Sequence, residues 1–257
     1  MKKALKLAIV CALTCCFWLI PAQAQAQENE GVATSVLITP KAGHEDELIK
    51  AITDYHHFVA QFEGHFEYNW YEILTGPHTG KYLARSGNHN WAEFDEEYDW
   101  QEEANKVFEE KVAPHIEHAQ RMMTEEMEEY SHWPESFDGY THFWVENWYI
   151  KNGHGMKFRK HLKKIVETLK ANGFPNYWGF FSVESGGYGG QVQIVSAHKG
   201  FADMADSEPS FYDIMSKELG GDEAFEEFMA EWGSTFKSGK NWTVKHMPEA
   251  SDYGKKE

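Results

Sequence analysis

Apolar residues along this chain follow a helical spacing in two places, and the two segments are related by a fixed offset. Residues 45–62 carry one apolar helical face, formed by Leu48, Ile52, Tyr55 and Val59. Residues 156–170 repeat this face 110 positions later with Phe158, Leu162, Ile165 and Leu169. A Lys-x-Gly-His sequence precedes both helices, at residues 41–44 and 151–154. The chain therefore contains an internal repeat.

Segments rich in β-branched and aromatic residues surround these helices and predict strands. They are 33–39, 66–74, 81–86 and 127–133 in the first repeat, and 140–150, 177–183, 191–197 and 241–245 in the second. Further helical regions are predicted from Trp91 through Val112 and past Pro114, and from Phe211 to Phe236 with a break at Gly220-Gly221. Each repeat thus has the ferredoxin-like order β-α-β-β-α-β. We expect an α+β protein in which the two sheets pack together as an intramolecular α/β barrel.

The N-terminus has the pattern of a secretory signal peptide. A basic start is followed by an apolar run to about Ile20 and by small-residue cleavage sites after Ala24 and Ala26. The run is shorter than the roughly 20 residues of a membrane span, although an uncleaved anchor is the alternative. We expect a signal peptide over 1–26 and a periplasmic or secreted protein with no stable membrane anchor after cleavage. The remaining divisions are a first repeat at 27–134, a linker at 135–139, a second repeat at 140–248 and a mobile tail at 249–257.

Cysteine usage and charge narrow the chemistry. All three cysteines, Cys11, Cys15 and Cys16, lie in the signal segment, so the mature chain has no disulfide and no cysteine-bound metal. Cleavage takes away three lysines and no acid, which changes the formal charge from -17 to -20. Such a surface repels nucleic acid. We expect a small-molecule partner and no nucleic-acid partner, with the protein a monomer or a homodimer.

The segment Pro40-Lys-Ala-Gly-His-Glu-Asp-Glu-Leu48, placed after a strand and before an amphipathic helix, resembles the start of modules in the dimeric α/β-barrel superfamily. Antibiotic-biosynthesis-monooxygenase-like domains belong to that superfamily, and the Trp91–Phe94 element also fits it. The resemblance covers nearly all of the mature chain and implies the barrel. It implies no single activity, because the superfamily includes cofactor-free monooxygenases, haem enzymes such as chlorite dismutases, and proteins without known chemistry.

The predicted strands are unusually aromatic, and a barrel built from them suits a flat apolar or aromatic ligand. We expect the ligand-binding residues to be Tyr68, Trp70, Trp144, Trp148, Trp178 and Phe180. A tightly filled barrel centre is the alternative, and the strand parity is open. Polar groups on the strands are the catalytic candidates: His142 with Glu146 as a general-base pair, and Arg85.

Metal and cofactor signals are weak, and we predict neither. His115 and His118 would share one helix face, but two imidazoles do not make a metal site. His161 and His198 are the candidates for a haem ligand, and neither sits in a motif. Three functions are left open: an exported soluble protein that binds a small apolar or aromatic molecule in the barrel, an oxygen-using enzyme of monooxygenase or haem type, and a structural or interaction protein without a pocket.

Overall fold

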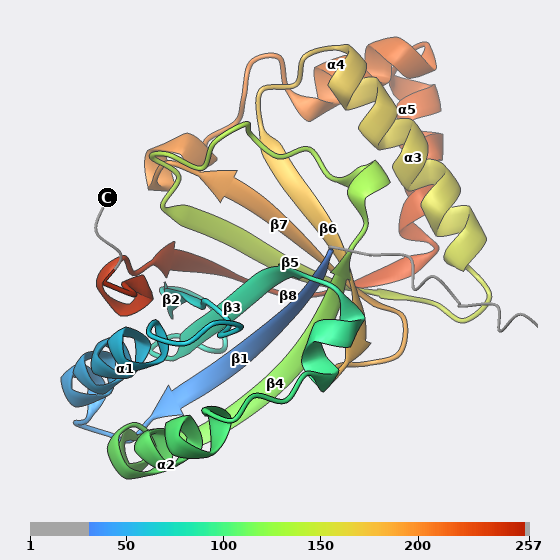
Figure 1. Cartoon of the computed structure of the whole chain (residues 1–257). Helices are drawn as coiled ribbons and strands as arrows, with labels where there is room; N and C mark the ends of the chain where they lie inside the picture. The colour runs from blue at the N-terminus through green and yellow to red at the C-terminus, as the bar shows by residue number, and fades with distance from the viewer. Residues whose placement is uncertain (1–30, 255–257) are drawn as a thin grey trace, which may run out of the picture.

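The computed structural model describes residues 31–254, so the predicted signal peptide and its cysteines lie outside the described residues. The eight strands of the described part of the chain pair antiparallel throughout and close into one barrel in the order β1-β3-β2-β8-β5-β7-β6-β4 (Figure 1). They are β1 (Val32–Pro40), β2 (Asn69–Ile73), β3 (Tyr82–His89), β4 (Ile116–Glu126), β5 (His142–Ile150), β6 (Tyr177–Ser185), β7 (Gln191–His198) and β8 (Phe236–His246).

The helices lie outside the ring of strands. α1 (Glu45–Val59) and α2 (Gln101–Lys111) cover one side, and α3 (Gly155–Ala171), α4 (Phe211–Leu219) and α5 (Asp222–Gly233) cover the other (Figure 1). Five short 3₁₀ helices complete the elements of residues 31–254: η1 (Trp91–Asp95), η2 (Ala113–His115), η3 (Glu128–Tyr130), η4 (Phe201–Met204) and η5 (Glu249–Ser251). Within residues 31–254 no helix combines the length and hydrophobicity that crossing a bilayer requires.

The two halves of the barrel are the two repeats. The first contributes four neighbouring strands in the order β4-β1-β3-β2, and the second contributes β6-β7-β5-β8. The halves join where β2 pairs with β8, with Tyr71 opposite His246, and where β4 pairs with β6, with Thr124 opposite Val183. The predicted α+β architecture, with two ferredoxin-like repeats closing one intramolecular barrel, is confirmed.

The repeated Lys-x-Gly-His sequence performs the same structural task in both halves. The ammonium group of Lys41 donates to the carbonyl of Pro114, and that of Lys151 donates to the carbonyl of Ser234, each over 2.6 Å. Both acceptors lie just before the last strand of their own repeat. Each lysine therefore ties the start of the first helix to the start of the last strand.

The helical apolar stripes pack against the outer face of the sheet. Phe158 and Leu162 of α3 are fully buried, as is Leu48 of α1. One core cluster joins α3, α4 and α5 to the second half, and another joins α1 to the first half. Both clusters lie between helices and strands, so they leave the barrel interior free of helical side chains.

Two predicted elements are wrong. The fourth strand was expected at 127–133, but β4 spans Ile116–Glu126, where many side chains are polar and exposed. The tail after residue 248 is not mobile as far as residue 254. Ala250 is fully buried, and the Tyr253 hydroxyl accepts a hydrogen bond from the Tyr68 backbone N–H at 2.7 Å, so these residues belong to the core of the first half.

Candidate functional site

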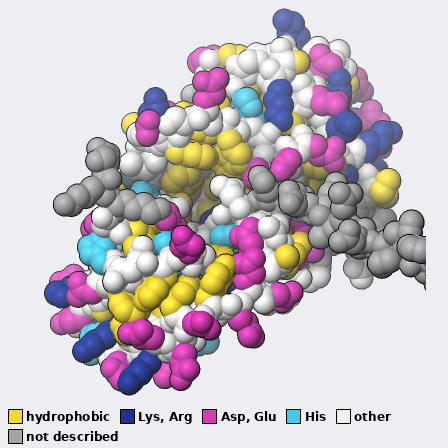
Figure 2. Space-filling model, viewed as in Figure 1, with side chains coloured by type: hydrophobic (Ala, Val, Ile, Leu, Met, Phe, Trp, Pro, Cys, Tyr) yellow, Lys and Arg dark blue, Asp and Glu magenta, His cyan; other side chains and the backbone are white. Residues whose placement is uncertain are grey.

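The interior of the barrel is a cavity of about 1370 Å³. All eight strands contribute lining residues, because alternate side chains of each strand point inward. Eight-stranded barrels have just enough room inside to hold one small ligand, and ligand cavities commonly measure about 300–1,000 Å³. On the face shown in Figure 2 the surface is hollowed between the two helix layers, with hydrophobic side chains along the hollow. The alternative of a protein without a pocket does not agree with a cavity of this volume.

Aromatic and aliphatic side chains form the middle of the cavity wall. The ring of Tyr71 meets that of Phe143 edge-on, with 5.6 Å between their centres. The other apolar lining residues of the strands are Leu37, Ile73, Leu83, Met122, Val145, Tyr149, Phe181, Val195, Trp242 and Val244. The cavity is therefore aromatic-lined, as expected for a site that takes a largely apolar molecule.

Arg85 of β3 places a positive charge in this wall. Its Nη1 atom donates to the hydroxyls of Ser35 at 3.4 Å and Thr124 at 3.3 Å, and its guanidinium lies over the Phe181 ring at 4.7 Å. Burial lowers the pKa of Arg85, and Tyr71 and Glu126 partly oppose that shift. Among residues 31–254 no carboxylate forms an ion pair with this guanidinium, so its charge faces hydroxyls, an aromatic ring and the cavity.

Uncharged amides line a second part of the cavity. The side-chain oxygen of Asn147 on β5 accepts hydrogen bonds from Gln191 at 2.9 Å and from Gln193 at 3.1 Å, both on β7. Asn147 is thus held by two donors from the neighbouring strand. This cluster can hydrogen-bond a ligand without adding charge.

At the end of the barrel where β4 stops, Trp133 covers part of the cavity. Its indole N–H donates to Glu126 at 2.7 Å, and its ring lies against Gly179 of β6. A Cβ atom on Gly179 would lie 1.8 Å from the Trp133 ring, so only glycine permits this approach. At the same end, His246 has a buried Nε2 with no hydrogen-bond partner among the described residues, and burial lowers its pKa.

The six predicted ligand-binding residues do not line the cavity, which corrects the predicted lining. They occupy the opposite parity of their strands and face outward. Trp148, Trp178 and Phe180 pack in the core under α3, and Trp70 packs in the core under α1. Tyr68 and Trp144 are half-buried on the same outer faces. Because the strands carry aromatic residues on both faces, the sequence could not show which set points inward.

The three catalytic candidates are not brought together. Arg85 lines the cavity, but His142 and Glu146 face outward on β5, four residues or roughly 13 Å apart. His142 bonds to the Thr141 hydroxyl at 2.9 Å, and burial lowers its pKa, as do Lys245 and His198. Burial raises the pKa of Glu146. The expected general-base pair is therefore not formed.

The candidate metal ligands are also separated by the fold. His115 lies in η2 and His118 on β4, so they do not share a helix face. His115 instead meets His44, with 3.0 Å between their Nδ1 atoms. No group of three or more suitable side chains within residues 31–254 could hold a metal ion.

Neither candidate haem ligand offers a fitting site. The Nδ1 of His161 on α3 donates to the carbonyl of Lys157 at 2.9 Å, and its Nε2 lies 3.3 Å from the carboxylate of Glu231. The Phe228 ring covers the imidazole, with 4.8 Å between the ring centres. His198 donates to the carbonyl of Asp203 at 3.1 Å and does not line the barrel cavity. These residues do not fit a haem.

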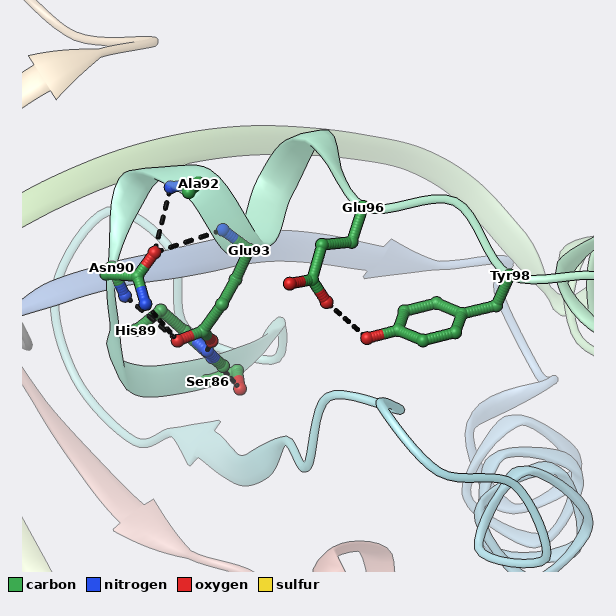
Figure 3. Close-up of polar contacts among 7 residues, drawn as sticks. All are labelled: Ser86, His89, Asn90, Ala92, Glu93, Glu96 and Tyr98. Carbon is green, nitrogen blue, oxygen red and sulfur yellow. Dashed lines mark hydrogen bonds and ion pairs between the residues drawn. The ribbon is translucent and has the colours of Figure 1, made fainter. Parts of the chain in front are cut away.

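A polar network that was not predicted from the sequence connects the end of β3 to η1 (Figure 3). The Ser86 hydroxyl lies 2.7 Å from Nε2 of His89, and Nδ1 of His89 lies 2.7 Å from the carboxylate of Glu93. Glu93 also accepts from the Asn90 side-chain amide at 2.7 Å. A capping box begins η1: the Asn90 backbone N–H donates to the Glu93 carboxylate at 3.3 Å, and the Glu93 backbone N–H donates to the Asn90 side-chain oxygen at 3.2 Å. The order of serine, imidazole and carboxylate is that of a nucleophilic site, and the spacing Ser-x-x-His-x-x-x-Glu could have revealed it.

The burial of this network gives it a structural role. Ser86 is 2% exposed, and the His89 ring is covered by Phe66 at 4.1 Å and by Phe94 at 5.4 Å between ring centres. A nucleophilic hydroxyl has to reach a substrate, and this one is covered. The network instead fixes the segment that connects β3 to η1.

Neither a protein-family model nor a curated protein sequence matches this chain. Solved structures do match it. A candidate monooxygenase from Lactobacillus acidophilus NCFM has a TM-score of 0.53 at 13% identity, covering 84% of this chain and 93% of that one. An anthrone oxidase-like protein has a TM-score of 0.51 at 10% identity, covering 86% and 92%. A chlorite dismutase from Candidatus Nitrospira defluvii, solved with imidazole, has a TM-score of 0.48 at 8% identity, covering 86% and 94%.

The matches extend over both repeats, so the whole two-repeat ring is shared and not one half of it. This is the dimeric α/β-barrel fold. One chain supplies both halves of the barrel, and the fold that the sequence resemblance implied is confirmed. At these identities the similarity establishes the fold and leaves the activity to be argued from the site.

Proposed function

We propose that this protein binds a small, largely apolar or aromatic molecule inside the barrel. The observation that supports the proposal is the cavity of about 1370 Å³, whose middle is walled by Tyr71, Phe143, Phe181 and Trp242. The apolar surface of the cavity is in contact with water in the free protein. A ligand that covers this surface removes it from water, and this makes the free energy of binding more favourable. The few polar groups among these aromatic residues would fix the orientation of the ligand.

A dye-binding experiment with a cavity-filling variant tests this proposal. The neutral dye N-phenyl-1-naphthylamine is expected to bind with a rise in fluorescence. Val195 of β7 lies opposite Val145 and Gly179 and lines the cavity, so Val195→Trp would fill its centre. We expect this variant to bind the dye at least about tenfold more weakly, a loss of about 1.4 kcal/mol.

The matched control adds a tryptophan to the surface. Met156 is 84% exposed, so Met156→Trp should bind the dye as the unchanged protein does. Thermal melts show that all three proteins are folded at the assay temperature. No dye binding by the unchanged protein, or equal binding by all three, would overturn the proposal.

Export is the second part of the proposal and is supported by the N-terminal sequence pattern. When the full chain is expressed in a bacterium with a periplasm, the mature protein should be found outside the cytoplasm. Sequencing of its N-terminus should give Gln25 or Gln27, after cleavage at Ala24 or Ala26. An intact N-terminus on cytoplasmic protein would contradict this.

A further inference from the structure

We infer that the molecule bound in the barrel is an aromatic anion whose carboxylate or sulfonate group pairs with Arg85. The inference rests on the proposed function and names the class of ligand for the same cavity. The basis of the inference is the guanidinium of Arg85, which forms no ion pair with the described residues.

The hydrogen bonds of Arg85 leave part of its guanidinium free. A guanidinium has five N–H donors, and the two recorded bonds, to Ser35 and Thr124, both start from Nη1. Neither Nε nor Nη2 has an acceptor among residues 31–254. Neither atom is completely buried, because Arg85 is absent from the buried polar atoms that lack a hydrogen-bond partner. Arg85 lines the cavity, so these donors face the open space of the cavity.

The surroundings of Arg85 do not neutralise it. Glu126 favours the charged guanidinium without an ion pair to it, and its carboxylate accepts the Trp133 indole N–H at 2.7 Å. A charge taken out of water is costly unless a counter-charge and hydrogen bonds compensate it. An anion with two oxygens would meet the free edge of the guanidinium in the bidentate geometry that arginine favours.

The same surroundings indicate that the anion is aromatic. The guanidinium carbon lies over the Phe181 ring, and Tyr71 and Phe143, which also line the cavity, stand edge-on to each other. A ligand whose oxygens reach Arg85 would place its carbon skeleton among these rings. The charge of the whole chain, -17, repels anions at long range, so binding of an anion depends on a specific cation inside the cavity.

Two dyes with one carbon skeleton separate this inference from the proposed function. N-phenyl-1-naphthylamine is neutral, and 8-anilinonaphthalene-1-sulfonate is the same skeleton with one sulfonate. We expect the sulfonate dye to bind the unchanged protein at least about tenfold more tightly than the neutral dye. In Arg85→Gln this preference should disappear while the neutral dye still binds, and Arg85→Lys should restore part of it.

Two control variants remove a positive charge elsewhere. Arg159 and Lys160 are both exposed on α3, outside the cavity lining. Arg159→Gln and Lys160→Gln should keep the preference for the sulfonate dye. Val195→Trp should weaken binding of both dyes, which places them in the barrel.

Each result has one meaning. Equal affinity of the unchanged protein for the two dyes overturns the aromatic-anion inference and leaves the proposed function standing. A preference that survives in Arg85→Gln, or that is lost in Lys160→Gln, overturns the role of Arg85. Failure of both dyes to bind overturns the proposed function itself.

Discussion

The guanidinium carbon of Arg85 lies 4.7 Å from the centre of the Phe181 ring, although the two residues belong to different repeats. Arg85 is on β3 and Phe181 on β6, and β1 and β4 lie between these strands in the ring. The contact therefore runs inside the barrel rather than along a sheet. A buried cation without a carboxylate partner lowers the stability of the folded protein. The position of Arg85 is therefore better explained by ligand binding than by stability.

Replacement of Arg85 by methionine tests that distinction. Methionine keeps a long side chain against Phe181 and removes the desolvated charge. We expect the free energy of unfolding of Arg85→Met, from urea denaturation, to be unchanged or higher by about 1 kcal/mol. Arg159→Met, which removes an exposed charge, should change it by less than about 0.5 kcal/mol. A loss of more than about 2 kcal/mol in Arg85→Met would show that Arg85 is mainly structural.

Gly179 should tolerate no side chain. An added Cβ would lie 1.8 Å from the Trp133 ring, so Gly179→Ala must displace the indole that covers one end of the cavity. We expect a loss of about 1–3 kcal/mol in the free energy of unfolding together with a shift in tryptophan fluorescence. Gly189→Ala is the matched control, because no heavy atom beyond its chain neighbours lies within 4 Å of the new Cβ. Equal stability of the two variants would contradict the close approach of Trp133 to Gly179.

The repeat was enough to predict the architecture, because matching helices, turns and strands at one offset define a two-unit barrel. The inner and outer faces of the strands were not predictable. In β5 the outward Trp144 and Trp148 alternate with the inward Phe143 and Tyr149, so hydrophobicity does not distinguish the two faces. Which face points into the barrel depends on which side chains pack against the helices, and this packing is a property of the tertiary structure.

The fourth strand and the Ser86 network were missed for different reasons. Residues 116–126 are mostly polar, and their pairing with β1 and β6 depends on backbone hydrogen bonds that leave no hydrophobic pattern. The hydrogen bonds from Ser86 through His89 to Glu93 are local in sequence, so their spacing was visible. Only the burial of Ser86 shows that the network is structural.

That network predicts a difference between two glutamates of one short segment. Glu93 holds both His89 and the capping box of η1, whereas Glu96 accepts only an exposed hydrogen bond from the Tyr98 hydroxyl (Figure 3). Glu93→Ala should lower the free energy of unfolding by about 1–3 kcal/mol, because it leaves buried donors unpaired. Glu96→Ala should change it by less than about 0.5 kcal/mol. Urea denaturation measures both, and equal losses would show that the His89 contact contributes nothing.

His56 of α1 should make stability depend on pH. Its side chain is buried against the Tyr253 ring, with 4.3 Å between ring centres, and its Nδ1 has no hydrogen-bond partner among the described residues. Burial lowers the pKa of His56 to about 4. A hydrogen bond to the backbone of Ala250 opposes the shift, His57 and His65 add to it, and Asp252 opposes it.

The sign follows from proton binding. In the unfolded chain His56 takes up its proton below its ordinary pKa of about 6.5, whereas the folded protein does so only below about 4. Stability contributed by neutral His56 is therefore complete above about pH 6.5 and is lost as the pH falls towards 4. The loss is on the order of 3 kcal/mol for a shift of this size.

Urea unfolding at a series of pH values between 7 and 4 measures this dependence. His56→Phe keeps a ring against Tyr253 and removes the titrating group, so its stability should fall less steeply over the same range. His118→Gln, which removes an exposed histidine from β4, should follow the unchanged protein. The same slope in His56→Phe and the unchanged protein would rule out His56 as the source. A slope that is reduced only in His56→Phe would identify His56 as the group whose protonation destabilises the folded protein.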